Sequence, residues 1–185
     1  MQTKELTDKI NELLREKNRV IIAVEGSSAS GKTTLGIELR QLYDCTVLHM
    51  DDFFLRPEQR TKERLNEPGG NVDRERFYEE VVITLQKGDV IEYRPFDCST
   101  FTIQPAKVIE PGRLIIVEGA YSTHPELGRY YDLSVFLDIE PEIQRARIIK
   151  RNTPDKAKLF FERWIPMEQK YFDIFKVRER CDIVL

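Results

Sequence analysis

Short apolar runs rich in β-branched residues recur along the chain and alternate with segments in which apolar residues have helical spacing. Such runs are typical of buried strands, and they predict strands at 19–25, 45–50, 113–118, 133–139 and 181–185. Helical spacing predicts helices at the N-terminus, after residue 31, around 77–85, from Pro141 and over 158–175. The alternation predicts an α/β fold, with a five-stranded, mostly parallel sheet and helices on both faces.

Two segments between these elements lack a clear period. Residues 52–72 are polar and rich in Arg, Pro and Gly, which predicts a long loop. Residues 89–111 alternate and contain Pro, which predicts a hairpin or an excursion at the sheet edge. The strands and helices nearly fill the 185 residues, so we expect one domain, 1–185.

A glycine- and serine-rich stretch joins the first predicted strand to the next helix. It matches G-x-x-x-x-G-K-[ST] at every fixed position, in the strand-to-helix context that this motif requires. A turn that binds nothing is the bland alternative, and a dinucleotide loop is set aside because Gly-x-Gly is absent. The motif predicts ATP binding by Gly26, Ser27, Ser28, Ala29, Ser30, Gly31, Lys32, Thr33 and Thr34.

The residue types in this loop suit phosphate chemistry. Gly26 and Gly31 let the backbone curl so that successive N–H groups point at phosphate oxygens. The helix that begins near Lys32 adds the positive end of its dipole. Lys32 supplies a mobile cation for the β- and γ-phosphates, and the Thr33 hydroxyl is a Mg²⁺ ligand.

Acidic residues stand at the ends of two predicted strands. Asp51 and Asp52 follow the second strand, and Glu118 ends the third. Because the carboxyl ends of parallel strands share one edge of a sheet, these acids should converge near Mg²⁺ and the γ-phosphate. One carboxylate can take a proton from an attacking hydroxyl, and others, Glu118 and Asp52, can bind the metal with Thr33. An ordinary turn and helix cap is the alternative for Asp51 and Asp52.

The order of these motifs resembles that of uridine kinase-like and nicotinamide riboside kinase-like P-loop kinases, within the phosphoribulokinase/uridine kinase superfamily. The resemblance rests on the phosphate loop, DDFF at 51–54, NVD at 71–73 and VEG at 117–119. RWIPMEQKYF at 163–172 is similar to the helix that follows the lid of nicotinamide riboside kinases. The resemblance implies that Asp51 is the base, that Glu118 sits at the metal and that Asp73 holds sugar hydroxyls.

One segment departs from the family pattern. Uridine kinases carry a Tyr-Asp-Phe-x-x-His-x-Arg-like stretch that helps to hold the nucleoside. The corresponding segment here is 96–103, where the positions expected to be His and Arg look like Phe101 and Ile103. This departure argues against a pyrimidine nucleoside as the acceptor.

Arginines cluster in two further segments. By resemblance, a lid covers about 145–160, and Arg147 and Arg151 are the candidates for contacting the migrating phosphate. A solvated basic helix face is the alternative for each of them. Arg60 and Arg64 follow the DDFF turn, where an acceptor would enter, and they suggest an acceptor with a carboxylate or phosphate. A solvated loop explains these two residues equally well.

Composition narrows the class of protein. The net charge of −3 offers no positive field for nucleic acid, and no apolar run is long enough to span a bilayer. The N-terminus lacks the apolar stretch of a secretory signal. Three widely spaced cysteines show neither a disulfide framework nor a zinc spacing, so we expect a cytoplasmic protein with reduced thiols. His49 and His124 show no ligand spacing and are interpreted as structural.

These features together predict a kinase that transfers the γ-phosphoryl group of MgATP to a hydroxyl of a small, nucleoside-like or other metabolite. The predicted catalytic residues are Asp51, Lys32, Arg147 and Arg151, and the predicted acceptor-binding residues are Asp51, Asp73, Arg60 and Arg64. The alternative is a nucleotide-dependent regulatory ATPase or switch without a small-molecule acceptor.

Overall fold

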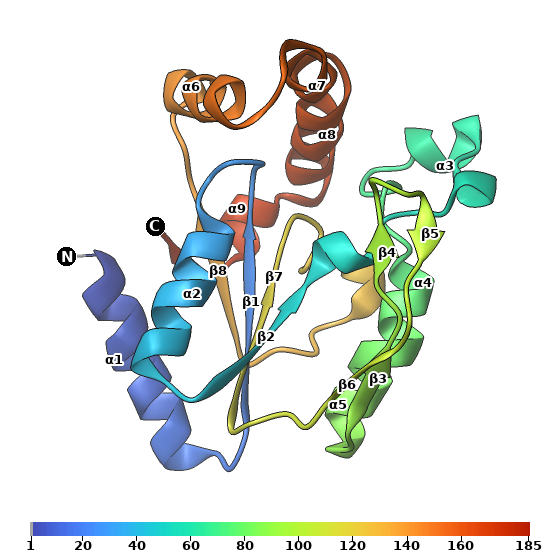
Figure 1. Cartoon of the computed structure of the whole chain (residues 1–185). Helices are drawn as coiled ribbons and strands as arrows, with labels where there is room; N and C mark the ends of the chain where they lie inside the picture. Colours follow the sequence, from blue (N-terminus) through green and yellow to red (C-terminus); the bar gives the residue numbers. More distant parts are fainter. Residues whose placement is uncertain (1) are drawn as a thin grey trace.

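A five-stranded parallel sheet forms the centre of the computed structural model, which describes residues 2–185 (Figure 1). The strand order is β2-β7-β1-β8-β9. The strands are β1 (Val20–Gly26), β2 (Cys45–His49), β7 (Leu114–Glu118), β8 (Leu133–Leu137) and β9 (Ile183–Val184). All four pairings are parallel, so the predicted fold class and sheet are confirmed.

The sheet is buried on both faces because alternate residues of β1 face opposite layers. Val20, Ile22 and Val24 pack with α1 (Gln2–Glu16) and α2 (Lys32–Leu42). Ile21 and Ala23 belong to a second cluster, which includes residues of α4 (Arg74–Phe77), α5 (Ile83–Lys87) and α8 (Ile165–Phe175). Burial on both faces accounts for the continuous apolar run of this strand.

The connection from β2 to β7 holds most of the irregular structure. The predicted loop at 52–72 is not wholly irregular, because it contains 3₁₀ turns at Met50–Phe53 and Pro57–Gln59 and the short helix α3 (Lys62–Asn66). The side chain of Thr61 caps α3 by accepting the N–H of Arg64, a local signal that the composition of the segment concealed. The predicted helix around 77–85 runs on through a π-helical turn at Tyr78–Val82.

The predicted hairpin is present as two short antiparallel ribbons. β3 (Ile91–Tyr93) pairs with β6 (Lys107–Ile109), and β4 (Phe96–Asp97) pairs with β5 (Thr102–Ile103). The β4–β5 ribbon lies beside the turn that follows β2 (Figure 1). This arrangement brings the ribbon to the carboxyl end of the central sheet.

The C-terminal helices stand over the same end of the sheet (Figure 1). α6 (Pro141–Arg151) ends before Asn152. α7 (Pro154–Leu159) begins four residues before the helix predicted from residue 158. A π-helical turn (Phe160–Trp164) joins α7 to α8, and α9 (Val177–Arg180) leads into β9. The predicted lid therefore spans the end of α6, all of α7 and the start of the π-helical turn.

Within residues 2–185, no helix is long and apolar enough to cross a membrane. The three cysteines are free, with Cys45 buried, Cys181 partly buried and Cys98 exposed.

Candidate active site

The loop between β1 and α2 has the backbone shape that its glycines allow. Gly26 and Gly31 have φ angles of 140° and 112°, a region that other residues rarely enter. A Cβ at Gly26 would lie 2.5 Å from the carbonyl oxygen of Leu137 on the neighbouring strand. α2 begins at Lys32, and the N–H groups of its first turn have no intrahelical partner. These donors and the helix dipole together form an anion-binding cradle.

Two side chains of the loop, Lys32 and Thr33, make hydrogen bonds that connect the loop to itself and to β7. Lys32 curls over the loop and donates from Nζ to the carbonyl oxygens of Gly26 and Ser27, at 2.8 and 2.9 Å. Thr33 donates its hydroxyl to Oε1 of Glu118, at 3.1 Å. The loop and the end of β7 are therefore in direct contact, as the parallel topology predicts.

Glu118 is buried at the end of β7, and its register explains its neighbours. It lies opposite His49 across the β2–β7 pair, and Nδ1 of His49 is 2.6 Å from Oε1 of Glu118. This hydrogen bond raises the pKa of His49 above its ordinary value. Within residues 2–185, Oε2 of Glu118 has no hydrogen-bond partner. A hydroxyl and a carboxylate are hard oxygen donors, the kind that Mg²⁺ prefers.

Asp51 lies directly after β2 and faces a pocket. Its carboxylate accepts no hydrogen bond within residues 2–185, and the residue is accessible to solvent. Desolvation of the carboxylate by the surrounding protein nevertheless raises the pKa of Asp51. The positive charge of Lys32 opposes this effect, and the negative charge of Glu118 reinforces it. An ionisable carboxylate without a protein partner, close to the phosphate-loop lysine, is placed to receive a proton.

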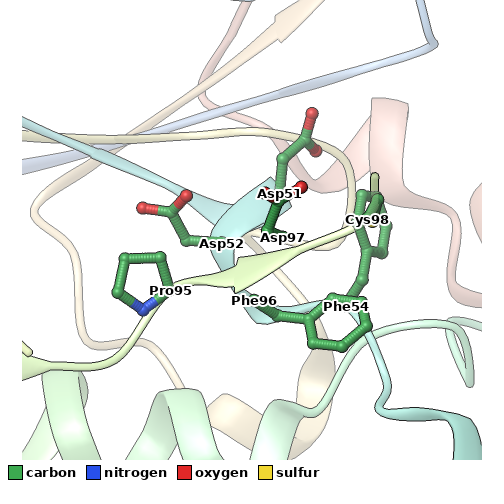
Figure 2. A pocket seen from close by; sticks show the side chains of 7 residues that line it. All are labelled: Asp51, Asp52, Phe54, Pro95, Phe96, Asp97 and Cys98. Atoms are coloured by element: carbon green, nitrogen blue, oxygen red, sulfur yellow. The ribbon is translucent and has the colours of Figure 1, made fainter. Parts of the chain in front are cut away.

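The pocket has a volume of about 380 Å³ and lies between the turn after β2 and the β4–β5 ribbon (Figure 2). Its walls combine carboxylates with aromatic rings. The lining residues are Asp51, Asp52, Phe54, Pro95, Phe96, Asp97 and Cys98. A small molecule seated here would lie against the carboxylate of Asp51.

The structure does not bring Asp52 to Thr33 and Glu118 as predicted. The two neighbouring carboxylates point in different directions from their short turn (Figure 2). The Asp52 carboxylate accepts the hydroxyl of Tyr93 at 2.7 Å and pairs with Lys107 at 3.1 Å. Asp52 therefore holds the β3–β6 ribbon in place.

Asp73 is deeply buried and caps α4. It accepts the N–H of Arg76 at 3.2 Å and an amide proton of Gln59 at 2.9 Å. The Arg76 side chain adds an ion pair at 3.4 Å. Both carboxylate oxygens therefore have protein partners in this structure, and the predicted contact with sugar hydroxyls would need one of them to be released.

The two arginines of the 56–64 segment have different surroundings. Arg64 makes a two-pronged ion pair with Glu75, both distances being 2.7 Å, and also binds two backbone carbonyls. Arg60 donates to the carbonyl of Leu55, and its guanidinium lies over Phe96 and Phe101. Arg64 therefore stabilises its own segment, and Arg60 lies behind the aromatic wall of the pocket.

Phe101 and Ile103 belong to the ribbon that closes the pocket. Phe101 is at the tip between β4 and β5, with a φ of 56° and half of its surface exposed. Ile103 pairs with Phe96 in the ribbon. The segment that departs from the uridine kinase pattern thus lies beside the candidate acceptor site.

The lid arginines differ in their contacts. Arg147 donates to the backbone carbonyls of Ala29 and Ser30 in the phosphate loop, at 3.0 and 3.3 Å. Arg151 lies over the ring of Phe160, at 5.2 Å from its centroid. Of these two candidates, only Arg147 contacts the phosphate loop in the structure.

Two acidic residues that the sequence analysis missed accept hydrogen bonds from the phosphate loop. Glu25, at the end of β1, is fully buried and accepts hydrogen bonds from Gly26, Tyr121, Thr123 and Tyr171. Burial raises the pKa of Glu25 to about 7. Glu25 ends an apolar run just as Glu118 does, and this position is the sequence signal that identifies it. Glu168, from α8, binds Ser28 and gave no local sequence signal.

His124 is structural, as the sequence analysis expected. It is buried, stacks on Tyr171 and bonds to the carbonyl of Pro68, while its other ring nitrogen accepts the N–H of Glu126. Burial lowers the pKa of His124, which keeps the ring neutral. His49 has a more direct place in the site than expected, because it touches Glu118.

The parallel sheet, the phosphate loop and the acids at the strand ends define a P-loop nucleotide-binding protein of the kinase type. The model of the "Phosphoribulokinase / Uridine kinase family" matches residues 21–158. The chain belongs to this family.

Curated relatives are distant and often longer. "Uridine kinase-like protein 3" of Arabidopsis thaliana is 27% identical over 179 residues, which cover 83% of this chain and 38% of the relative. A uridine kinase of Brevibacillus brevis is 25% identical over 155 residues, which cover 76% of this chain and 70% of the relative. The chain thus spans less than half of the length of the Arabidopsis protein.

Solved structures share the fold over the whole chain. A structure from Bacillus stearothermophilus, described as a "possible uridine kinase", has a TM-score of 0.69 and 23% identity and is covered to 99%, with 98% of this chain aligned. At this identity the likeness shows the fold alone.

Proposed function

We propose that the protein transfers the γ-phosphoryl group of MgATP to a hydroxyl of a small molecule bound in the pocket beside Asp51. The observation that supports this most directly is the Asp51 carboxylate, which has no hydrogen-bond partner within residues 2–185 and lines a pocket close to Lys32. A regulatory ATPase needs no such pocket. Membership of a family that includes uridine kinases and phosphoribulokinases also favours transfer to a hydroxyl.

On the nucleotide side, the loop amides and Lys32 bind the phosphates of ATP. The cation of Lys32 leaves the carbonyls of Gly26 and Ser27 for the phosphate oxygens. Thr33 and Glu118 hold Mg²⁺, which supplies positive charge to the phosphates when bound. Asp52 is not part of this metal site, because Tyr93 and Lys107 hold its carboxylate elsewhere.

On the acceptor side, Asp51 takes the proton of the attacking hydroxyl. The hydroxyl oxygen forms a bond to the γ-phosphorus while the bond to the β–γ bridging oxygen breaks, and ADP leaves with that electron pair. The raised pKa of Asp51 makes it a better proton acceptor than an ordinary carboxylate. Arg147, which contacts the phosphate loop, is the lid arginine assigned to the migrating phosphoryl group, and Arg151, which lies over the ring of Phe160, is assigned to the lid itself.

Arg60 is assigned to the acceptor pocket, where it supports the ring of Phe96. Asp73 and Arg64 shape the segment behind the pocket through their hydrogen bonds to Gln59 and Glu75. In this proposal the acceptor contacts the residues that line the pocket. Arg60, Asp73 and Arg64 lie behind the pocket and determine the shape of the pocket.

The test is a screen for acceptor-dependent ADP formation with nucleosides, vitamins and sugar acids as candidate acceptors. A kinase forms ADP and a phosphorylated product in equal amounts with at least one compound. If the protein hydrolyses ATP at one rate whatever compound is added, the regulatory ATPase is correct instead.

A further inference from the structure

Ser28, the third residue of the phosphate loop, is held by two helices that come much later in the chain. Its N–H and its hydroxyl both donate to the carboxylate of Glu168 on α8, at 2.8 and 2.5 Å. Its carbonyl accepts an amide proton from Gln144 on α6, at 2.9 Å. Every polar group of Ser28 is therefore paired with the helices that flank the predicted lid.

Glu168 has no comparable partner elsewhere within residues 2–185. It is 6% exposed, and its two hydrogen bonds there both come from Ser28. A buried carboxylate is costly unless its oxygens are hydrogen-bonded. The pairing with Ser28 therefore fixes the position of Glu168 and of the loop at the same time.

α8 and α6 also hold the loop on either side of Ser28. One turn after Glu168, the hydroxyl of Tyr171 donates to Glu25, the residue that precedes the loop, at 3.1 Å. On the other side, Arg147 of α6 binds the carbonyls of Ala29 and Ser30. These contacts turn loop carbonyls toward the helices, and successive N–H groups on the inner side form a site for phosphate oxygens.

We propose that Glu168 is a positioning residue that holds the phosphate loop in its nucleotide-binding shape through Ser28 and couples that shape to the lid. The inference rests on the proposed binding of ATP by this loop. It differs from an opposite interpretation, in which the carboxylate occupies donors that a phosphate would use and must leave before ATP binds. The two interpretations predict opposite changes in affinity.

The test is the dissociation constant of ATP, measured by calorimetry on the full chain with Mg²⁺ and no acceptor. Glu168→Ala removes both acceptors of Ser28, and we expect about tenfold weaker binding. Glu168→Gln keeps the size and can still accept the N–H while donating to the hydroxyl, so we expect a loss of less than about threefold. Asp173→Ala, an exposed acid on the same helix, is the matched control and should bind ATP like the wild type.

A double-mutant cycle separates positioning from a general structural role. Ser28→Ala removes only the hydroxyl, and we expect about threefold weaker binding, with no further loss when it is added to Glu168→Ala. If Glu168→Ala does not fold, the losses in Ser28→Ala and Glu168→Gln decide the question. Ser28→Thr retains both donors and should restore the affinity.

Several results would overturn the proposal. These are tighter or unchanged binding in Glu168→Ala, equal losses in Glu168→Gln and Glu168→Ala, or additive losses in the double variant. Absence of ATP binding by the wild type would instead overturn the proposed function. The wild-type titration therefore separates the failure of one from the failure of the other.

Discussion

The two halves of the site are built from the chain in different ways. The phosphate loop is a single run of nine residues, Gly26 to Thr34, from the end of β1 to the first turn of α2. The acceptor pocket combines the turn after β2 with a ribbon that comes some forty residues later. The function of a continuous motif can be predicted from its sequence. The function of a pocket assembled from separate segments depends on tertiary packing, which the sequence alone does not reveal.

The largest expected effect is on the nucleotide half. Lys32→Ala removes the cation over the phosphates, and we expect kcat/KM for ATP to fall by about a hundredfold to a thousandfold. Steady-state kinetics at several ATP concentrations measure this change. Lys107→Ala, which loses a partly exposed pair with Asp52 and a contact with the ring of Tyr93, is the control and should change the same value far less. Equal losses in the two variants would contradict the assignment of Lys32.

The second effect tests the buried acid below the loop. Burial raises the pKa of Glu25 to about 7 from its ordinary value of 4.5. Between pH 4.5 and about pH 7, Glu25 is therefore protonated in the folded state but ionised in the unfolded state. This contribution to stability is full below pH 4.5 and is lost as the pH rises to about 7, by on the order of 3 kcal/mol.

Urea unfolding of the wild type and Glu25→Gln at pH 5 and pH 7.5 measures this pH dependence. The variant should lose less stability between the two pH values than the wild type does. The same slope in both proteins would show that Glu25 does not titrate in this range.

The third effect separates shape from binding on the acceptor half. Arg64→Ala breaks its pair with Glu75 and leaves two backbone carbonyls without their donor, so we expect a loss of stability of about 1–3 kcal/mol. Arg56→Ala loses an exposed pair with Glu58 and one hydrogen bond to the side chain of Gln59, and it should cost less than about 1 kcal/mol. Chemical unfolding measures both. If Arg64→Ala leaves the stability unchanged and raises the KM for the acceptor, Arg64 binds the substrate and does not mainly stabilise its own segment.

The smallest effect concerns the lid. Arg147→Ala loses its contacts with the phosphate loop, and we expect kcat/KM for ATP to fall by about tenfold. Arg151→Ala loses a contact with Phe160 and should reduce it by only about threefold. The reverse order would place Arg151, rather than Arg147, on the migrating phosphate.

Prediction from sequence succeeded for the phosphate loop and the sheet, and it was less successful for the acceptor pocket. The strands, the loop and the convergence of Thr33 with Glu118 follow from local patterns and from the shared edge of parallel strands. Asp52 did not follow, because adjacent residues in a short turn point in different directions, and its partners Tyr93 and Lys107 come from the later ribbon. α3 was hidden by a polar composition that suits loops and short capped helices alike.

Long-range contacts were invisible for the same reason. Ser28 and Glu168 are 140 positions apart, so no window of sequence displays their pairing. Arg60 and Arg64 look alike in sequence, and only the positions of Glu75 and of the two phenylalanines distinguish them. The nature of the acceptor depends on the pocket assembled by such contacts.

The most direct test of the account compares Asp51→Asn with the wild type, using an acceptor identified by the screen. The variant keeps the size of the side chain but has little basicity, so acceptor-dependent ADP formation should fall by about a hundredfold or more. The affinity for ATP, measured by calorimetry, should stay within about twofold of the wild type. Near-normal turnover in Asp51→Asn, or a parallel loss of ATP binding, would contradict the role of Asp51 as the base.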